Sequence, residues 1–117
     1  MNKALAYITC LVLCLACTPE DQKIPPDIIS IDTMKVLVWE LTLAGEYASH
    51  QREEDTTIKF LKTAYFSEVL AIHHLDKNSF AKSFNFYEAH PYLNKILIDS
   101  VNYYASRQRT ELYKKKE

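Results

Sequence analysis

The sequence has 117 residues, of which 48% are hydrophobic and 25% are charged, and its formal net charge is −1. This length is sufficient for one domain, and the composition is that of a folded chain rather than a disordered one. A nucleic-acid partner would need a strongly basic domain, which this balance excludes. The single glycine leaves almost none for the tight turns of β-hairpins, so the composition predicts an all-α fold.

The first 16 residues have the organisation of a signal peptide. One positive charge, Lys3, precedes an apolar run from Ala4 to Ala16 in which only Thr9 is plainly polar. A helix of that length would rise about 20 Å, which is too short for the roughly 30 Å hydrocarbon core of a bilayer. We therefore predict a cleaved signal peptide over residues 1–16.

The apolar run ends at Ala16-Cys17, and charged residues begin soon after it. This arrangement resembles a bacterial lipobox, in which the cysteine receives a diacylglycerol and the lipoprotein signal peptidase cuts after a small residue. The resemblance implies cleavage between Ala16 and Cys17 and lipidation of Cys17. Cys14 departs from the pattern, because that position usually carries an aliphatic residue. The alternative is an ordinary secretory signal cut elsewhere, which would leave Cys17 as an unpaired thiol.

Cysteine content favours the lipoprotein interpretation. Cys10 and Cys14 would leave with the signal peptide, so Cys17 would be the sole cysteine and no disulfide would form within the chain. Acylation removes a free thiol that would be a liability in an oxidising compartment. Two or three acyl chains give stable membrane attachment. We expect a lipid-anchored protein of the bacterial cell envelope, at the outer membrane and facing the periplasm or the cell surface.

Prolines at positions 19, 25 and 26 disfavour helix, so residues 17–30 are expected to form an extended tether after the acylated cysteine. A helical domain, a small bundle of three or four helices, is predicted over residues 31–117. Its charge is divided: residues 20–55 hold nine acids and three bases, whereas residues 56–117 hold six acids and ten bases. Packing of an acidic first helix beside basic later helices is the simplest account of this division.

The first predicted helix is capped by Ser30 or Asp32 and continues to about residue 48. Its apolar positions follow the spacing of a buried face and are Met34, Leu37, Val38, Leu41, Ala44, Gly45 and Ala48, with Val36, Trp39 and Leu43 broadening the stripe. Gly45 on that face is expected to allow another backbone to approach closely. The polar residues 49–55 form a connection.

Three further helices are expected. The second runs from about residue 56 to 74, with a stripe formed by Ile58, Leu61, Tyr65, Val69 and Ile72. The third runs over residues 77–89, with Asp76 as N-cap, Leu75 and Phe80 as a hydrophobic staple, and Phe80, Phe84 and Tyr87 aligned. Pro91 begins the fourth helix, whose apolar positions are Leu93, Ile96, Leu97, Val101, Tyr104 and Leu112. The basic residues 107–116 are expected to fray.

These residues resemble a family. The lipobox cysteine, the proline-containing tether, the stretch Glu40-Leu41-Thr42-Leu43-Ala44 and the later array of Phe80, Ser83, Tyr87 and His90-Pro91 are similar to small lipoproteins of Bacteroidota grouped as domain of unknown function 4296. The resemblance covers most of residues 17–105. It departs where family members carry a glutamate after the Leu-Ala pair, since this chain has Gly45 followed by Glu46. The resemblance implies an envelope location and a helical fold, and no established activity.

The sequence contains no motif for catalysis, metal or cofactor binding. One glycine cannot build a phosphate-binding loop, and the chain that follows the predicted cleavage site contains neither Cys-x-x-Cys nor His-Glu-x-x-His. His73 and His74 are adjacent, so their rings point about 100° apart on a helix, and helix termination explains them better than a metal. For His90, capping or packing is the simpler role. Glu40 is expected to be solvated or paired with Lys59 or Lys62.

Thirteen aromatic residues follow position 17, which is more than one small core can hide. Core packing with half-buried tyrosines is the simpler account, and a groove for an apolar or extended peptide is the functional one. The candidate interaction surface comprises Trp39, Glu40, Phe84, Tyr87, His90 and Tyr103. We predict a non-enzymatic, chaperone-like or accessory module that binds another envelope protein. The alternative is a small-ligand-binding or enzymatic domain that uses an aromatic pocket with Glu40 or His90.

Overall fold

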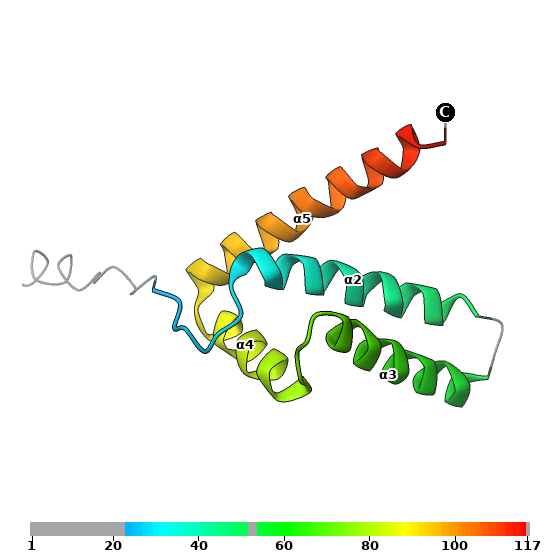
Figure 1. The fold of residues 1–117 in the computed structure, drawn as a ribbon, viewed down its shortest axis with the longest axis horizontal. Helices are drawn as coiled ribbons and strands as arrows, with labels where there is room; N and C mark the ends of the chain where they lie inside the picture. Colours follow the sequence, from blue (N-terminus) through cyan, green and yellow to red (C-terminus); the bar gives the residue numbers. More distant parts are fainter. Residues whose placement is uncertain (1–22, 52–53, 117) are drawn as a thin grey trace, which may run out of the picture.

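The computed structural model describes residues 23–51 and 54–116. The predicted signal peptide, the cleavage site at Ala16 and the lipidation site at Cys17 lie outside the described residues. Four helices follow one another in these ranges, with no strand among them: α2 (Ile31–Ser49), α3 (Asp55–Ile72), α4 (Lys77–Ala89) and α5 (Pro91–Lys114) (Figure 1). The prediction of an all-α fold is confirmed.

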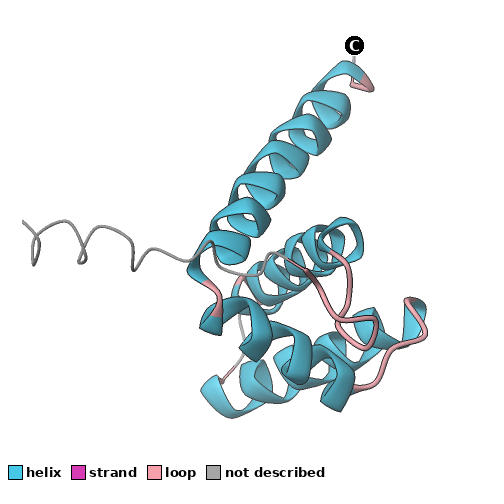
Figure 2. Ribbon diagram, turned by 90° about the vertical axis from the view of Figure 1, so that its left-hand side faces the viewer, coloured by secondary structure: helices cyan, strands magenta, loops and turns pink. Residues whose placement is uncertain are grey.

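Helices α2 and α3 lie side by side and run in opposite directions (Figure 1). The short helix α4 follows α3 and leads into α5, which contacts both α4 and α2. Figure 2 shows that α5 then extends beyond the other three helices, so that its last turns project from the body of the domain. The helices therefore meet most closely where α2 and α5 begin and α3 ends.

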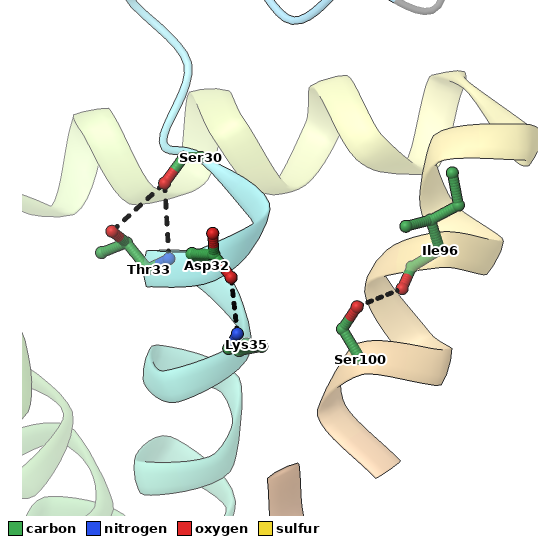
Figure 3. Close-up of polar contacts among 6 residues, drawn as sticks. All are labelled: Ser30, Asp32, Thr33, Lys35, Ile96 and Ser100. Carbon is green, nitrogen blue, oxygen red and sulfur yellow. Dashed lines mark hydrogen bonds and ion pairs between the residues drawn. The ribbon is translucent and has the colours of Figure 1, made fainter. Parts of the chain in front are cut away.

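Side-chain caps fix where two helices begin. The hydroxyl of Ser30 accepts a hydrogen bond from the Thr33 N–H at 3.4 Å, and Asp76 accepts one from the Ser79 N–H at 2.8 Å (Figure 3 shows the first). Each contact satisfies an amide that the first turn of a helix leaves without an intrahelical partner. Pro91 occupies the start of α5. The predicted caps at residues 30 and 76 and the proline start are confirmed.

The end of α3 depends on a left-handed residue that is not glycine. The helix ends at Ile72, and His74 has a φ of 56°. The His74 N–H donates to the Ala71 carbonyl at 3.0 Å, and the Leu75 N–H donates to the Leu70 carbonyl at 2.9 Å. These two bonds form a Schellman motif, in which glycine is the usual residue at the left-handed position. The two histidines therefore belong to the helix end, as the sequence indicated.

The core is a single cluster to which every helix contributes. Its members are Ile28, Met34, Leu37, Leu70, Tyr87, Leu93 and Leu97. Helix α3 supplies Leu70 as its one buried residue, and Ile72 of the predicted stripe is 66% exposed. That part of the stripe was wrong, because Ile72 follows Leu70 by two residues and so points to the opposite side of α3, away from the core. The predicted α5 stripe likewise ends before Leu112, which is 63% exposed because the helix projects beyond its neighbours there.

Gly45 does not mark a close approach of two backbones. A Cβ built at this position would meet nothing within 4 Å. The residue is half-buried in the interior of α2, where glycine is a poor helix former. The expectation of a tight contact at Gly45 was wrong, because no neighbouring element lies within contact distance of a Cβ at this position.

Candidate interaction site

The residues that precede α2 are held onto α4 by two side chains. The Ile29 N–H donates to the Ser83 hydroxyl at 2.9 Å, and the Tyr87 hydroxyl donates to the Ile29 carbonyl at 2.7 Å. Ser83 is 0% exposed and Tyr87 is 1% exposed, and burial raises the pKa of Tyr87. Both polar groups of the Ile29 backbone are thus satisfied by α4.

Apolar and charged contacts strengthen the same attachment. Ile28 is 8% exposed, and Ile24 and Ile29 pack against the core. Asp27 forms an ion pair with Lys82, which lowers the pKa of the Asp27 carboxyl. Residues 23–30 of the proline-containing segment are non-helical, as expected, but residues 24–29 belong to the folded unit. That unit therefore begins before residue 31.

The structure separates the six residues of the predicted interaction surface. Tyr87 lies in the core, and Trp39 is 9% exposed. Trp39 is covered in part by the Arg109 guanidinium, which lies 5.4 Å from the ring centroid. Phe84 on α4 and Tyr103 on α5 are 41% and 68% exposed. The exposed rings of this set thus belong to two different helices.

His90 joins α4 to α5. Its ring stacks on Phe86 with 4.1 Å between centroids, and its Nδ1 lies 2.6 Å from the Phe86 carbonyl oxygen. The His90 carbonyl accepts the Asn94 N–H at 2.9 Å, which is the first backbone bond of α5. These contacts occupy the ring in a helix junction, in agreement with the capping interpretation of His90.

Glu40 pairs with a histidine rather than with a lysine. Its Oε2 lies 2.5 Å from Nε2 of His73, and the two side chains are 38% and 23% exposed respectively. The expected partners, Lys59 and Lys62, lie in the first half of α3. Because α2 and α3 are antiparallel, the middle of α2 faces the end of α3, which is where His73 lies. The expected lysine partners of Glu40 were wrong for this reason.

An apolar groove opens between α2 and α3, next to the Glu40–His73 pair. We call it the α2–α3 groove, and its lining residues are Leu43, Ala44, Tyr47, Tyr65, Glu68, Val69 and Ile72. The rings of Tyr47 and Tyr65 lie 5.8 Å apart, and Tyr47 is 62% exposed. Leu43 is 47% exposed. One carboxylate, Glu68, interrupts this apolar surface.

Sequence reasoning assigned most of the lining residues of the groove to buried helix stripes. Their apolar spacing is that of a core face, and they stay accessible because none of the described helices covers this side of the hairpin. A local signal existed in the breadth of the α2 stripe, which is too wide for one neighbouring helix. The breadth of the stripe did not indicate which part of it would be left uncovered.

A second hollow lies between the start of α2 and the middle of α5. It is lined by Lys35, Ile96, Asp99, Ser100, Tyr103, Tyr104 and Arg107. Lys35 is paired with Asp32 at 2.5 Å, and Asp99 is paired with Lys95 at 2.7 Å, which raises the pKa of Lys95. The Ser100 hydroxyl donates to the Ile96 carbonyl at 2.7 Å (Figure 3). Several polar groups of this hollow are therefore engaged within the protein.

Within residues 23–51 and 54–116, no group of three His, Cys, Asp or Glu side chains lies close enough together to hold a metal ion. Of the helices that the structure describes, none combines the length and the hydrophobicity needed to cross a membrane.

Residues 25–111 match the family model described as Domain of unknown function (DUF4296). The chain belongs to the DUF4296 family. No curated protein and no solved structure matches it. The DUF4296 match begins at Pro25, so it includes the segment that Ser83 and Tyr87 hold in place. Three residues of the array that carried the resemblance have structural roles in this DUF4296 domain. Ser83 and Tyr87 hold the segment before α2, and His90 packs at the junction of α4 and α5.

Proposed function

We propose that this protein is a lipid-anchored component of the bacterial envelope whose DUF4296 domain binds another envelope protein through the α2–α3 groove. The anchor is Cys17, and the domain acts as a non-enzymatic accessory or chaperone-like module at the outer membrane. The observation that carries the interaction role is the groove itself. Its apolar side chains remain in water although the domain has a well-formed core elsewhere.

The exposure of Leu43, Tyr47 and Ile72 supports a binding role because the three lie together. Single exposed apolar residues are ordinary on protein surfaces, whereas contiguous apolar patches mark sites of interaction. Tyrosine is also among the residues enriched at the centres of protein interfaces, since its ring is apolar and its hydroxyl can still be hydrogen-bonded.

The shape and charge of the groove define the partner's chemistry. Two antiparallel helices form its walls, which is the geometry that receives an amphipathic helix or another extended apolar segment. Glu68 is the one charged residue in the lining. We therefore expect the bound segment to present an apolar face and a lysine or arginine that meets Glu68.

Photo-crosslinking in cells tests this proposal. A photoreactive amino acid at Ile72, which is 66% exposed, should crosslink one partner. The matched control places it at Tyr103, which is 68% exposed on α5 and should not give that product. Glu68→Lys should reduce the Ile72 product. Equal products from positions 72 and 103, or an Ile72 product insensitive to Glu68→Lys, would contradict the proposal.

The small-ligand or enzymatic alternative rests on the Glu40–His73 pair at the end of the groove, since a carboxylate beside an imidazole is a common acid–base arrangement. Glu40→Gln separates the two functions. If the groove binds a protein segment through apolar contacts and Glu68, the Ile72 crosslink survives this change. If the Glu40→Gln variant no longer supports the protein's function in cells but still gives an unchanged Ile72 crosslink, the small-ligand or enzymatic alternative is favoured.

The anchor is tested independently of the groove. Cys17→Ser should abolish incorporation of a radiolabelled or clickable fatty acid and leave the signal peptide uncleaved or cut elsewhere. Cys14→Leu is the matched control, because it removes a cysteine while restoring the aliphatic residue that the lipobox usually contains. Normal labelling of the Cys17→Ser variant would exclude lipidation at this residue.

A further inference from the structure

The last turns of α5 and the turn that follows them form a second surface, which we call the α5 tip and define as residues 107–116. It contains five cations, Arg107, Arg109, Lys114, Lys115 and Lys116, and one acid, Glu111. Arg107 lies 3.7 Å from Glu111, and Arg109 covers Trp39. Among the described residues, no carboxylate lies within salt-bridge distance of Lys114, Lys115 or Lys116. The tip is thus a positive surface on a chain whose net charge is −1.

Apolar side chains are exposed within the same turns. Leu112 is 63% exposed and Tyr113 is 74% exposed, and both lie beyond Ala105, the last buried residue of α5. They line a shallow hollow together with Arg109 and Lys116. Arg109, Leu112 and Tyr113, at i, i+3 and i+4, lie on one stripe of α5, and Lys116 follows in the turn after the helix ends at Lys114. An apolar pair is therefore flanked along the chain by a cation at each end.

We propose that the α5 tip binds an anionic lipid surface. A bilayer interface can contact both the cations and the apolar side chains of the tip. Lysine and arginine place their charged ends among the headgroups, while the aliphatic parts of their side chains lie on apolar surface. Tyrosine is also suited to the bilayer interface, because its ring is apolar and its hydroxyl can remain in contact with water. Clusters of lysine and arginine near a membrane recognise acidic headgroups, and each cation contributes about fivefold to the affinity.

A lipid surface explains the tip better than a folded acidic protein does. The lysines occupy consecutive positions 114–116 across the exposed end of α5 and the turn that follows it, which suits a diffuse layer of charge rather than a fixed set of carboxylates. Such a contact would also orient a protein that is attached to the membrane through a lipid on Cys17. This inference rests on the proposed function only for the location of the protein in the envelope.

Vesicle sedimentation with the full chain carrying Cys17→Ser tests the inference without acyl chains, so failure of the lipid anchor or the groove would not affect it. The protein should bind phosphatidylglycerol-containing vesicles more tightly than phosphatidylcholine vesicles, and added salt should weaken the difference. Lys114→Gln/Lys115→Gln/Lys116→Gln should reduce the affinity for phosphatidylglycerol roughly 100-fold. Leu112→Ser/Tyr113→Ser should also reduce it.

The matched control, Lys59→Gln/Lys62→Gln/Lys77→Gln, removes three exposed lysines elsewhere. It has the same net charge as the triple variant of the tip. This control should keep most of the wild-type affinity. Equal losses in the two triple variants would mean that net charge alone drives binding, and would overturn the assignment to the tip. Binding that is independent of phosphatidylglycerol, or unaffected by the Leu112 and Tyr113 changes, would overturn it as well.

Discussion

The two ends of this helical domain are built differently. At one end, the segment before α2, the start of α2, the end of α3, α4 and the start of α5 share a core that includes Met34, Leu37 and Tyr87. At the other end, the α2–α3 hairpin and the α5 tip expose Tyr47, Phe60 and Tyr113, each more than 60%. The same kinds of residue are thus buried at one end and exposed at the other.

The comparison shows which end stabilises the fold and which end leaves apolar side chains exposed. Stability comes mainly from the end where three or more elements meet, because the large side chains that lose nearly all contact with water, such as Met34, Leu37 and Tyr87, lie there. At the opposite end, a side chain is surrounded by only one or two helices. An apolar side chain there stays accessible to a partner. We therefore expect substitutions at the first end to change folding and substitutions at the second end to change binding.

The largest expected effect on stability is that of Leu37→Ala. Leu37 is 0% exposed, so truncation leaves a cavity in the shared core and should reduce the free energy of unfolding by about 2–5 kcal/mol. Phe60→Ala, at a residue that is 72% exposed, should change it by less than about 0.5 kcal/mol. Urea denaturation followed by circular dichroism measures both. Similar losses in the two variants would erase the contrast between the ends.

The next effect concerns the attachment of the segment before α2. Tyr87→Phe and Ser83→Ala each remove one partner of the Ile29 backbone and should each cost about 1–3 kcal/mol. Because both changes release the same residue, the double variant should lose less than the sum. Tyr103→Phe serves as an exposed control. Additive losses in urea denaturation would show that the two side chains act on separate parts of the fold.

Two backbone substitutions should stabilise the protein modestly. Gly45→Ala replaces a poor helix former where nothing lies within 4 Å and should add up to about 1 kcal/mol. His74→Gly relieves a left-handed residue with φ 56° and should add about 1 kcal/mol. Thermal unfolding, monitored by circular dichroism, measures both. A lower melting temperature for Gly45→Ala would indicate a close contact at this glycine after all.

The smallest effect is a pH dependence at the cap of α4. Hydrogen bonds from Ser79 lower the pKa of Asp76 below its ordinary value of 3.8. Its contribution to stability is therefore fully present above that value and is lost as the pH falls through the lower folded-state pKa. Asp76→Asn keeps a capping oxygen without the charge, so its melting temperature should fall less between about pH 5 and about pH 2. Glu88→Gln controls for the loss of one acid, and an equal fall in Asp76→Asn and wild type would contradict the prediction.

Local features of the sequence were sufficient to predict the helices. The caps at Ser30 and Asp76 and the proline at position 91 act within one helical turn, so they operate in the same way in any tertiary context. The spacing of Met34, Leu37 and Ala48 in α2 likewise identified residues that are buried. The array of Phe80, Ser83, Tyr87 and His90-Pro91, together with the lipobox cysteine, the tether and the stretch 40–44, indicated the family that the family model confirms.

Tertiary structure alone decided which partners these residues have. Tyr87 reaches Ile29 across 58 positions and Glu40 reaches His73 across 33, and no local pattern encodes either pairing. The exposure of Tyr47 and Ile72 was equally undetermined, because a helical stripe is buried only where another element covers it. The sequence by itself thus determined the helices and their ends, whereas the packing of antiparallel α2 and α3 and the projection of α5 decided which apolar faces form a core and which remain open.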